Sequence, residues 1–188
     1  MKKFLITLVL SCISLCVFSQ EHLSFKGIPI EGSMTAFCQK LKDKGYTELE
    51  RDNNTTLFNG DFTGELATIV VGATDDGNNV HSIVVGFDAC SEWKTLVDTY
   101  DYYKELYTRK YGTPAASIEN NPSRGDSNTM LMLALSQGTV TYVSDWSVAG
   151  GTIELFINKV GYTHGSVMIR YRDAQNIEAK FKSDLEDI

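Results

Sequence analysis

The chain has few of the residues that metal sites and nucleophilic catalysis require. Its 188 residues include three histidines, His22, His81 and His164, which lie far apart in the sequence and match no zinc-ligand spacing. The GxSxG, phosphate-loop and dinucleotide-binding motifs are absent as well. We therefore predict a protein that is not an enzyme and that carries no metal and no cofactor.

Basic residues and long apolar runs are also scarce. The chain has 17 lysines and arginines against 24 acidic residues, and without the basic pair Lys2 and Lys3 the net charge becomes −9. An acidic surface disfavours nucleic acid and anionic lipid, because recognition of both begins with basic side chains. After residue 19 no stretch is long and apolar enough to cross a bilayer, so no transmembrane segment is expected in the mature chain.

Residues 1–19 have the pattern of an export signal. Lys2 and Lys3 form a positive head, and an apolar run too short to span a bilayer follows them. Cleavage after Ser19 predicts a periplasmic or secreted protein. The segment ending at Cys12 resembles a lipobox, whose lipidated cysteine would instead make the protein an outer-membrane lipoprotein. We favour Ser19, because lipidation at Cys12 would leave a very short apolar core.

Cleavage after Ser19 would leave two of the four cysteines, Cys38 and Cys90. In an oxidising compartment two remaining cysteines predict one disulfide, since no other pairing exists. The alternative is that both are small buried apolar residues that never meet, because Cys38 lies on the apolar stripe of a predicted helix.

The rest of the chain repeats one pattern: a helix ending at glycine, followed by three strands. The first unit, residues 20–90, begins with an edge strand near Leu23–Ile30. The second unit, residues 91–188, carries an insertion at 113–137 that ends in a short helix capped by Asp126 or Ser127, and a tail helix follows the unit. The expected helices span 33–45, with Ser33 as cap, and 91–112, with Ser91 as cap. The expected strands are 55–62, 65–74, 80–89, 139–148, 152–160 and 166–173.

Alternation within the last two strands assigns their side chains to two faces. Ile153, Leu155 and Ile157 alternate with more polar neighbours and belong under the helices. The other set places Phe156 and Met168 on an open face among charges, where Arg170 stands opposite Glu154. Large apolar residues on an open sheet face predict a binding surface, although Arg170 and Glu154 could also be an ordinary cross-strand ion pair.

A helix with three strands, given twice in an exported chain, resembles the β-lactamase-inhibitor-protein-like fold. The likeness covers residues 25–171 and includes the paired aromatic segments Asp61-Phe62 and Asp145-Trp146. It implies an α+β protein of two αβββ repeats, which form one antiparallel sheet with helices packed on one face. It also implies a protein or envelope partner held on the concave sheet face. By position, this surface consists of Trp146, Phe156, Met168, Arg170 and Arg172.

Two other functions remain open from the sequence. One is an extracytoplasmic hydrolase whose site is assembled from acids such as Asp61, Asp145 and Glu154. The other is a lipid-anchored envelope assembly factor, which requires Cys12 as the mature N-terminus. Among the short motifs, 75–79 is interpreted as a turn and not a calcium loop, and Arg124-Gly125-Asp126 as a chance match to an adhesive tripeptide.

Overall fold

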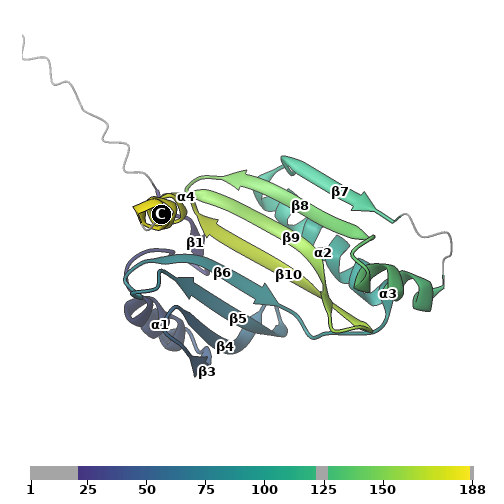
Figure 1. The fold of residues 1–188 in the computed structure, drawn as a ribbon, viewed down its shortest axis with the longest axis horizontal. Helices are drawn as coiled ribbons and strands as arrows, with labels where there is room; N and C mark the ends of the chain where they lie inside the picture. Colours follow the sequence, from purple (N-terminus) through teal and green to yellow (C-terminus); the bar gives the residue numbers. More distant parts are fainter. Residues whose placement is uncertain (1–20, 122–126, 187–188) are drawn as a thin grey trace, which may run out of the picture.

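A computed structural model of the chain describes residues 21–121 and 127–186. These residues form an α+β fold with four helices, an eight-stranded antiparallel sheet and a separate two-stranded sheet (Figure 1). The predicted leader, residues 1–19, and the tripeptide 124–126 lie outside the described residues. In the described part of the chain, no helix is long and apolar enough to span a membrane.

The large sheet is built from two runs of consecutive strands that meet in its centre. Its order is β3-β4-β5-β6-β10-β9-β8-β7, and every neighbouring pair is antiparallel. At the centre β6 pairs with β10, where Val85 lies opposite Ile169. The strands are β3 (Thr47–Arg51), β4 (Thr55–Phe62), β5 (Glu65–Ala73), β6 (Val80–Gly86), β7 (Ala116–Asn120), β8 (Thr141–Val148), β9 (Gly151–Val160) and β10 (His164–Asp173).

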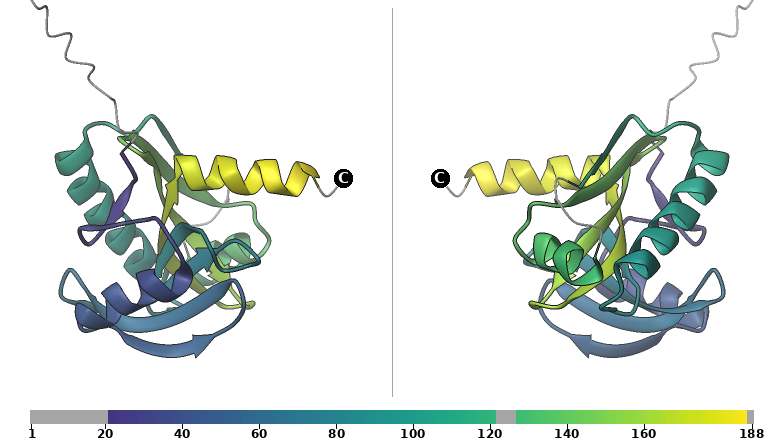
Figure 2. Two further views of the ribbon diagram at one scale, coloured as in Figure 1. Left: turned by 90° about the vertical axis from the view of Figure 1, so that its left-hand side faces the viewer. Right: turned by 90° about the vertical axis from the view of Figure 1, so that its right-hand side faces the viewer.

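Two helices and a short hairpin cover one face of this sheet. Helix α1 (Met34–Asp43) begins at Ser33, whose side chain accepts a hydrogen bond from the Ala36 amide. Helix α2 (Trp93–Tyr111) lies behind β8–β10, and the β1–β2 hairpin (Ser24–Phe25 and Ile28–Pro29) lies beside it (Figure 2). The third helix, α3 (Asn128–Ser136), packs against α2 and the adjoining ends of β9 and β10.

The core lies between these helices and the sheet. Strands β9 and β10 contribute the predicted alternate residues Ile153, Leu155 and Ile169, all fully buried. The hairpin contributes Phe25, whose ring stacks on Phe62 with centroids 6.0 Å apart. Helix α2 contributes an aromatic and apolar stripe at helical spacing: Trp93, Leu96, Tyr100, Tyr103 and Tyr107.

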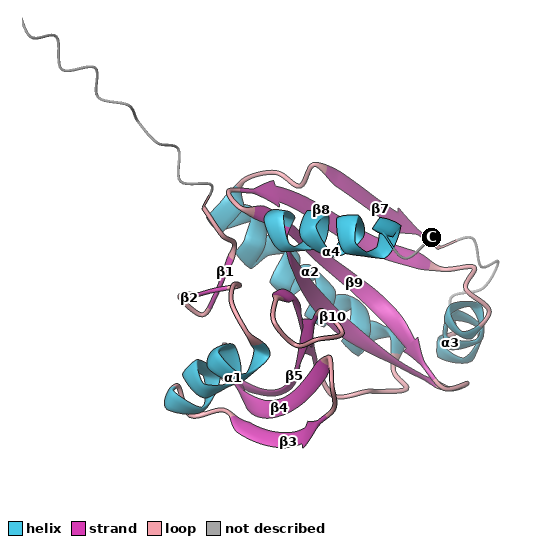
Figure 3. Cartoon of the chain, turned by 60° about the vertical axis from the view of Figure 1, so that its left-hand side comes forward, coloured by secondary structure: helices cyan, strands magenta, loops and turns pink. Residues whose placement is uncertain are grey.

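Helix α4 (Ala174–Glu186) breaks the expectation that the helices share one face. The tail helix itself is confirmed, but it projects from the opposite side of the sheet to α2 (Figures 2 and 3). It starts directly after β10 and contacts the ends of β6, β9 and β10. The physical reason is that Asp173, the last residue of β10, accepts a hydrogen bond from the Asn176 amide and so caps α4. The chain therefore leaves the sheet without a connecting loop.

Three other expectations on secondary structure were wrong. Strands β3 and β7 were missed, so each principal helix is followed by four strands instead of three. The expected single strand near 23–30 is the β1–β2 hairpin, which turns at Lys26 and Gly27, both with positive φ. The expected Ser91 cap is also wrong, because the Oδ1 atom of Asn128, at the start of α3, accepts the hydrogen bond from the Trp93 amide.

The predicted disulfide is wrong, and both cysteines are free. Cys38 belongs to α1 and is fully buried, and this burial raises the pKa of its thiol. Cys90 lies just before α2, in an isolated bridge with Gly165 of β10. Helix α1 and the start of α2 pack against different strands, which keeps the two thiols apart.

Candidate interaction face

The sheet surface opposite α1 and α2, here called the open face, carries a row of apolar side chains that crosses several strands. The strand register places Val143 opposite Phe156, and Phe156 opposite Met168. All three are half-buried, and at the edge Ile118 lies opposite Val143 with 53% of its surface exposed. The row therefore combines residues from β7, β8, β9 and β10 into one contiguous surface.

The apolar surface continues into the other half of the sheet, in register with Arg170, which is two residues beyond Met168 on β10. Val84 of β6 lies opposite Val70 of β5, which lies opposite Leu57 of β4. These three residues are also half-buried. They alternate with fully buried neighbours on the same strands, so they lie on the opposite face from those neighbours. The open face is thus apolar along much of its width. The sequence indicates this surface through the two strands that are apolar on both faces, β5 and β6.

A charged group lies beside the apolar row. Arg170 donates a hydrogen bond to Glu154 over 2.8 Å, and Arg172 approaches the same carboxylate at 3.6 Å. Asp145 stands directly opposite Glu154 on β8. Partial burial raises the pKa of Asp145, the Glu154 charge raises it further, and Arg172 opposes the change.

Arg170 joins the charged group to the apolar row. Its guanidinium carbon lies 4.8 Å from the centre of the Phe156 ring, which places the cation over the aromatic face. The ion pair with Glu154 and this ring contact hold the arginine flat against the sheet, with 31% of its side chain still exposed. A flat, preordered arginine beside an aromatic ring is typical of the residues that contribute most to protein interfaces.

Helix α4 forms a wall at one end of the open face. Ile177, Phe181 and Leu185 recur every four residues, so they lie along one side of the helix. Ile177 borders the same surface hollow of about 400 Å³ as Thr152 and Arg172, which belong to the open face. Phe181 and Leu185 are 57% and 50% exposed, so this side of α4 extends the apolar surface away from the sheet.

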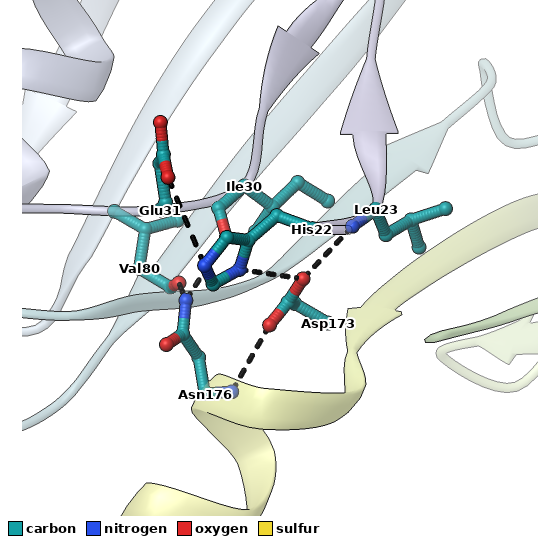
Figure 4. Close-up of polar contacts among 7 residues, drawn as sticks. All are labelled: His22, Leu23, Ile30, Glu31, Val80, Asp173 and Asn176. Atoms are coloured by element: carbon teal, nitrogen blue, oxygen red, sulfur yellow. Dashed lines mark hydrogen bonds and ion pairs between the residues drawn. The ribbon is translucent and has the colours of Figure 1, made fainter. Parts of the chain in front are cut away.

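A buried polar cluster fixes where α4 leaves the sheet (Figure 4). Asp173 is fully buried and accepts hydrogen bonds from the amides of Asn176, at 3.0 Å, and Leu23, at 2.9 Å. Its second partner from the N-terminal segment is the Nδ1 atom of His22, at 3.0 Å. The Nδ2 group of Asn176 donates to the carbonyls of Ile30 and Val80, both at 2.9 Å.

These contacts join three distant parts of the chain: the segment before α1, the start of β6 and the start of α4. A helix start held by five such hydrogen bonds has little freedom to tilt relative to the sheet. The cluster therefore determines the position of the apolar side of α4 beside the open face.

Four of the five residues proposed for partner binding lie together on the open face: Phe156, Met168, Arg170 and Arg172. The fifth, Trp146, lies on the other face of the sheet. It is 1% exposed, its indole nitrogen donates to the Gly112 carbonyl, and its ring packs against Tyr107. The register explains this, because Trp146 pairs with Ile153, a member of the buried set.

The acids proposed for a hydrolytic site do not come together. Asp145 and Glu154 are cross-strand neighbours, but Asp61 lies on β4, which three strands separate from β9. Four strand spacings amount to roughly 19 Å at about 4.8 Å each. Among residues 21–121 and 127–186, no three histidine, cysteine or acidic side chains are grouped so that they could hold a metal ion.

Comparison with protein-family models, with curated proteins and with solved structures finds no match to this chain.

Proposed function

We propose that this chain is an exported, non-enzymatic binding protein that captures a protein of the cell envelope on its open face. The observation that carries this proposal is the row from Val143 to Met168, with Arg170 lying over Phe156 on a sheet surface opposite the main helices. The partner is a protein segment that presents apolar side chains to this row and to α4. The acidic net charge of the chain disfavours an anionic membrane or nucleic acid as the partner.

The order of the elements supports an interpretation of the fold as two related units. One unit is α1 followed by β3–β6, and the other is α2 followed by β7–β10, with α3 inserted before β8. In the sheet the last strands of the two runs, β6 and β10, are neighbours, and the first strands are the two edges. This arrangement supports the resemblance to the β-lactamase-inhibitor-protein-like fold, with four strands in each unit.

The chemistry of the open face suits a protein partner. Half-buried apolar side chains on a broad surface lose water when another apolar surface covers them, which stabilises a complex. Arg170 is already ordered by Glu154 and Phe156, so it would lose little conformational freedom on binding. Glu154 and Arg172 at the border of the row can then select the orientation of the partner.

Site-specific photo-crosslinking in the native host tests the location of the binding surface. A photoreactive phenylalanine analogue at Val143 should give a crosslinked protein product of discrete mass. The same analogue at Tyr102, which is 49% exposed on α2 and lies on the other side of the sheet, is the matched control and should give none. Equal products from both positions would contradict the proposed surface.

Substitution of the central residues tests their contribution. The double change Phe156→Ala and Arg170→Ala should reduce the crosslinked product from position 143 by about 100-fold or more, because two central interface residues are removed. Far-ultraviolet circular dichroism and the thermal midpoint must show that the variant is folded. An unchanged product from a folded variant would overturn the proposal.

Export has its own test, which does not depend on the partner. The intact mass of the protein from its native envelope should begin at Gln20, as cleavage after Ser19 predicts. A mass that begins at a lipidated Cys12 would replace the free binding protein by a lipid-anchored one, with the same open face available for a partner.

A further inference from the structure

A second cavity lies on the helix-covered side of the sheet, and at Glu21 and Val148 it borders the hollow beside α4. It has a volume of about 660 Å³ and lies between the β1–β2 hairpin, helix α2 and the turn from β8 to β9. Cavities of roughly 300–1,000 Å³ are typical of small-molecule sites. The volume is therefore sufficient for a ligand, and the question is which chemistry its lining favours.

Five aromatic rings of phenylalanine and tyrosine line the cavity. Phe62 and Tyr103 have ring centroids 6.1 Å apart, and Tyr107 lies 5.7 Å from Tyr111 and 6.4 Å from Tyr171. These rings come from β4, α2 and β10, so the cavity exists only in the folded chain. Such a lining favours a ligand with an apolar or aromatic body.

Two lysines and one acidic residue, Glu21, line the same cavity. Lys26 lies in the turn of the hairpin with its ammonium 5.2 Å from the centre of the Phe62 ring, and the Lys110 ammonium lies 4.8 Å from the Tyr111 ring. Within the described residues, neither ammonium has a carboxylate within 4.0 Å, whereas five other lysines do. Two cations without acidic partners, in a protein with excess acidic residues, favour an anionic group on the ligand.

Two buried hydroxyl groups offer a hydrogen bond to the ligand. Tyr107 and Tyr171 both line the cavity, and their hydroxyls are hydrogen-bonded to each other. Two hydroxyls carry two protons, but their mutual hydrogen bond uses only one. The other proton has no acceptor among the described residues, and burial raises the pKa of both phenols, so they remain donors. A ligand oxygen inside the cavity would satisfy this donor.

We propose that this cavity binds an acidic amphiphile, a small molecule with an apolar body against the tyrosines and an anionic group at Lys26 and Lys110. The cavity has no lining residue in the row from Val143 to Met168, so ligand binding and partner binding can be tested with separate substitutions. The ligand class follows from the combination of aromatic lining, unpaired cations and the unused hydroxyl proton.

Fluorescence titration with 8-anilinonaphthalene-1-sulfonate, which has an aromatic body and one sulfonate, tests the site. The folded chain should bind one equivalent saturably, and dodecanoate should displace the probe. Dodecyltrimethylammonium has the same tail length with a cationic head, and it should compete at least about tenfold more weakly. Equal competition by the two surfactants below their micelle concentrations would show that the site does not select an anion, and would overturn the proposal.

Four variants locate the binding. The double change Lys26→Gln and Lys110→Gln should weaken probe binding by about tenfold or more, whereas Lys94→Gln with Lys182→Gln removes the same charge elsewhere and should have no effect. Ala149→Trp, an exposed position in the lining, should block the cavity without disturbing the core. Phe156→Ala should leave probe binding unchanged. If Phe156→Ala abolishes probe binding while Ala149→Trp does not, the probe occupies the open face and the cavity proposal fails.

Discussion

Replacement of Asp173 by alanine is the sharpest test of how the structure positions α4. Asp173 is 0% exposed and receives hydrogen bonds from two backbone amides, those of Leu23 and Asn176, and from the ring of His22. Alanine removes all three acceptor contacts and leaves the amides buried. The N-terminal segment and the start of α4 should therefore loosen together.

The size of the effect follows from the separate contacts. Loss of the helix cap to Asn176 costs about 1 kcal/mol. A buried amide left without an acceptor, here that of Leu23, costs about 1–3 kcal/mol more. The free energy of unfolding should fall by about 3 kcal/mol, and the thermal midpoint by about 6–12 °C for a chain of this size.

Guanidinium denaturation followed by circular dichroism measures the loss, and hydrogen exchange of the Leu23 and Asn176 amides locates it. Asp184→Ala is the control, because that acid lies on α4 with 56% of its side chain exposed and should change stability by less than about 0.5 kcal/mol. If Asp173→Ala lowers the free energy of unfolding by less than about 1 kcal/mol, with both amides still protected from exchange, Asp173 does not hold α4 in position.

Three further predictions test the register, the thiols and the half-buried His81. Leu155→Ala should lower the free energy of unfolding by about 2–5 kcal/mol, whereas Phe156→Ala should lower it by only about 1 kcal/mol. The two effects differ because these adjacent residues lie on opposite faces of the sheet. Equal losses in denaturant titrations would contradict this register. Without reductant, a folded chain beginning at Gln20 should take up one alkyl group by mass, at the half-buried Cys90. After unfolding it should take up two, because the fully buried Cys38 then becomes accessible. No uptake after unfolding would indicate a disulfide. Burial lowers the pKa of His81 below its ordinary 6.5, so the unfolded chain binds this proton more tightly than the folded chain does. The free energy of unfolding should therefore fall as the pH drops below 6.5, with a slope of at most about 1.4 kcal/mol per pH unit. His81→Gln should lose this part of the pH dependence, and identical pH profiles for the two proteins would contradict it.

Local patterns predicted most of the secondary structure. The strand expected at 55–62 is confirmed at both ends, because alternation begins and stops there together with turn residues. Ser33 and Ser127 are confirmed as helix caps, each accepting from the amide three residues later. Strands β3 and β7 were missed because they are mostly exposed edge strands, and such residues show little hydrophobic alternation.

The candidate site was predicted in part. Phe156, Met168, Arg170 and Arg172 share one face because a period of two residues and an antiparallel register follow directly from the sequence pattern. Trp146 was assigned to that face from its place beside Asp145 in the repeat, and its pairing with Ile153 places it on the other. The contribution of α4 could not be predicted, because the direction in which a tail helix leaves a strand depends on distant hydrogen-bond partners.

The sequence by itself determined most of the helices and strands, the buried alternate residues of β9 and β10, and the acidic balance of the chain. These properties depend on neighbours within a few residues, so periodicity and capping are sufficient to predict them. The tertiary structure alone decided that β6 pairs with β10, that Cys38 and Cys90 stay apart, and that Asp173 joins the N-terminal segment to α4. It also assembled the aromatic cavity from three separate segments. Each of these features depends on which distant surfaces pack together, and local sequence patterns do not contain that information.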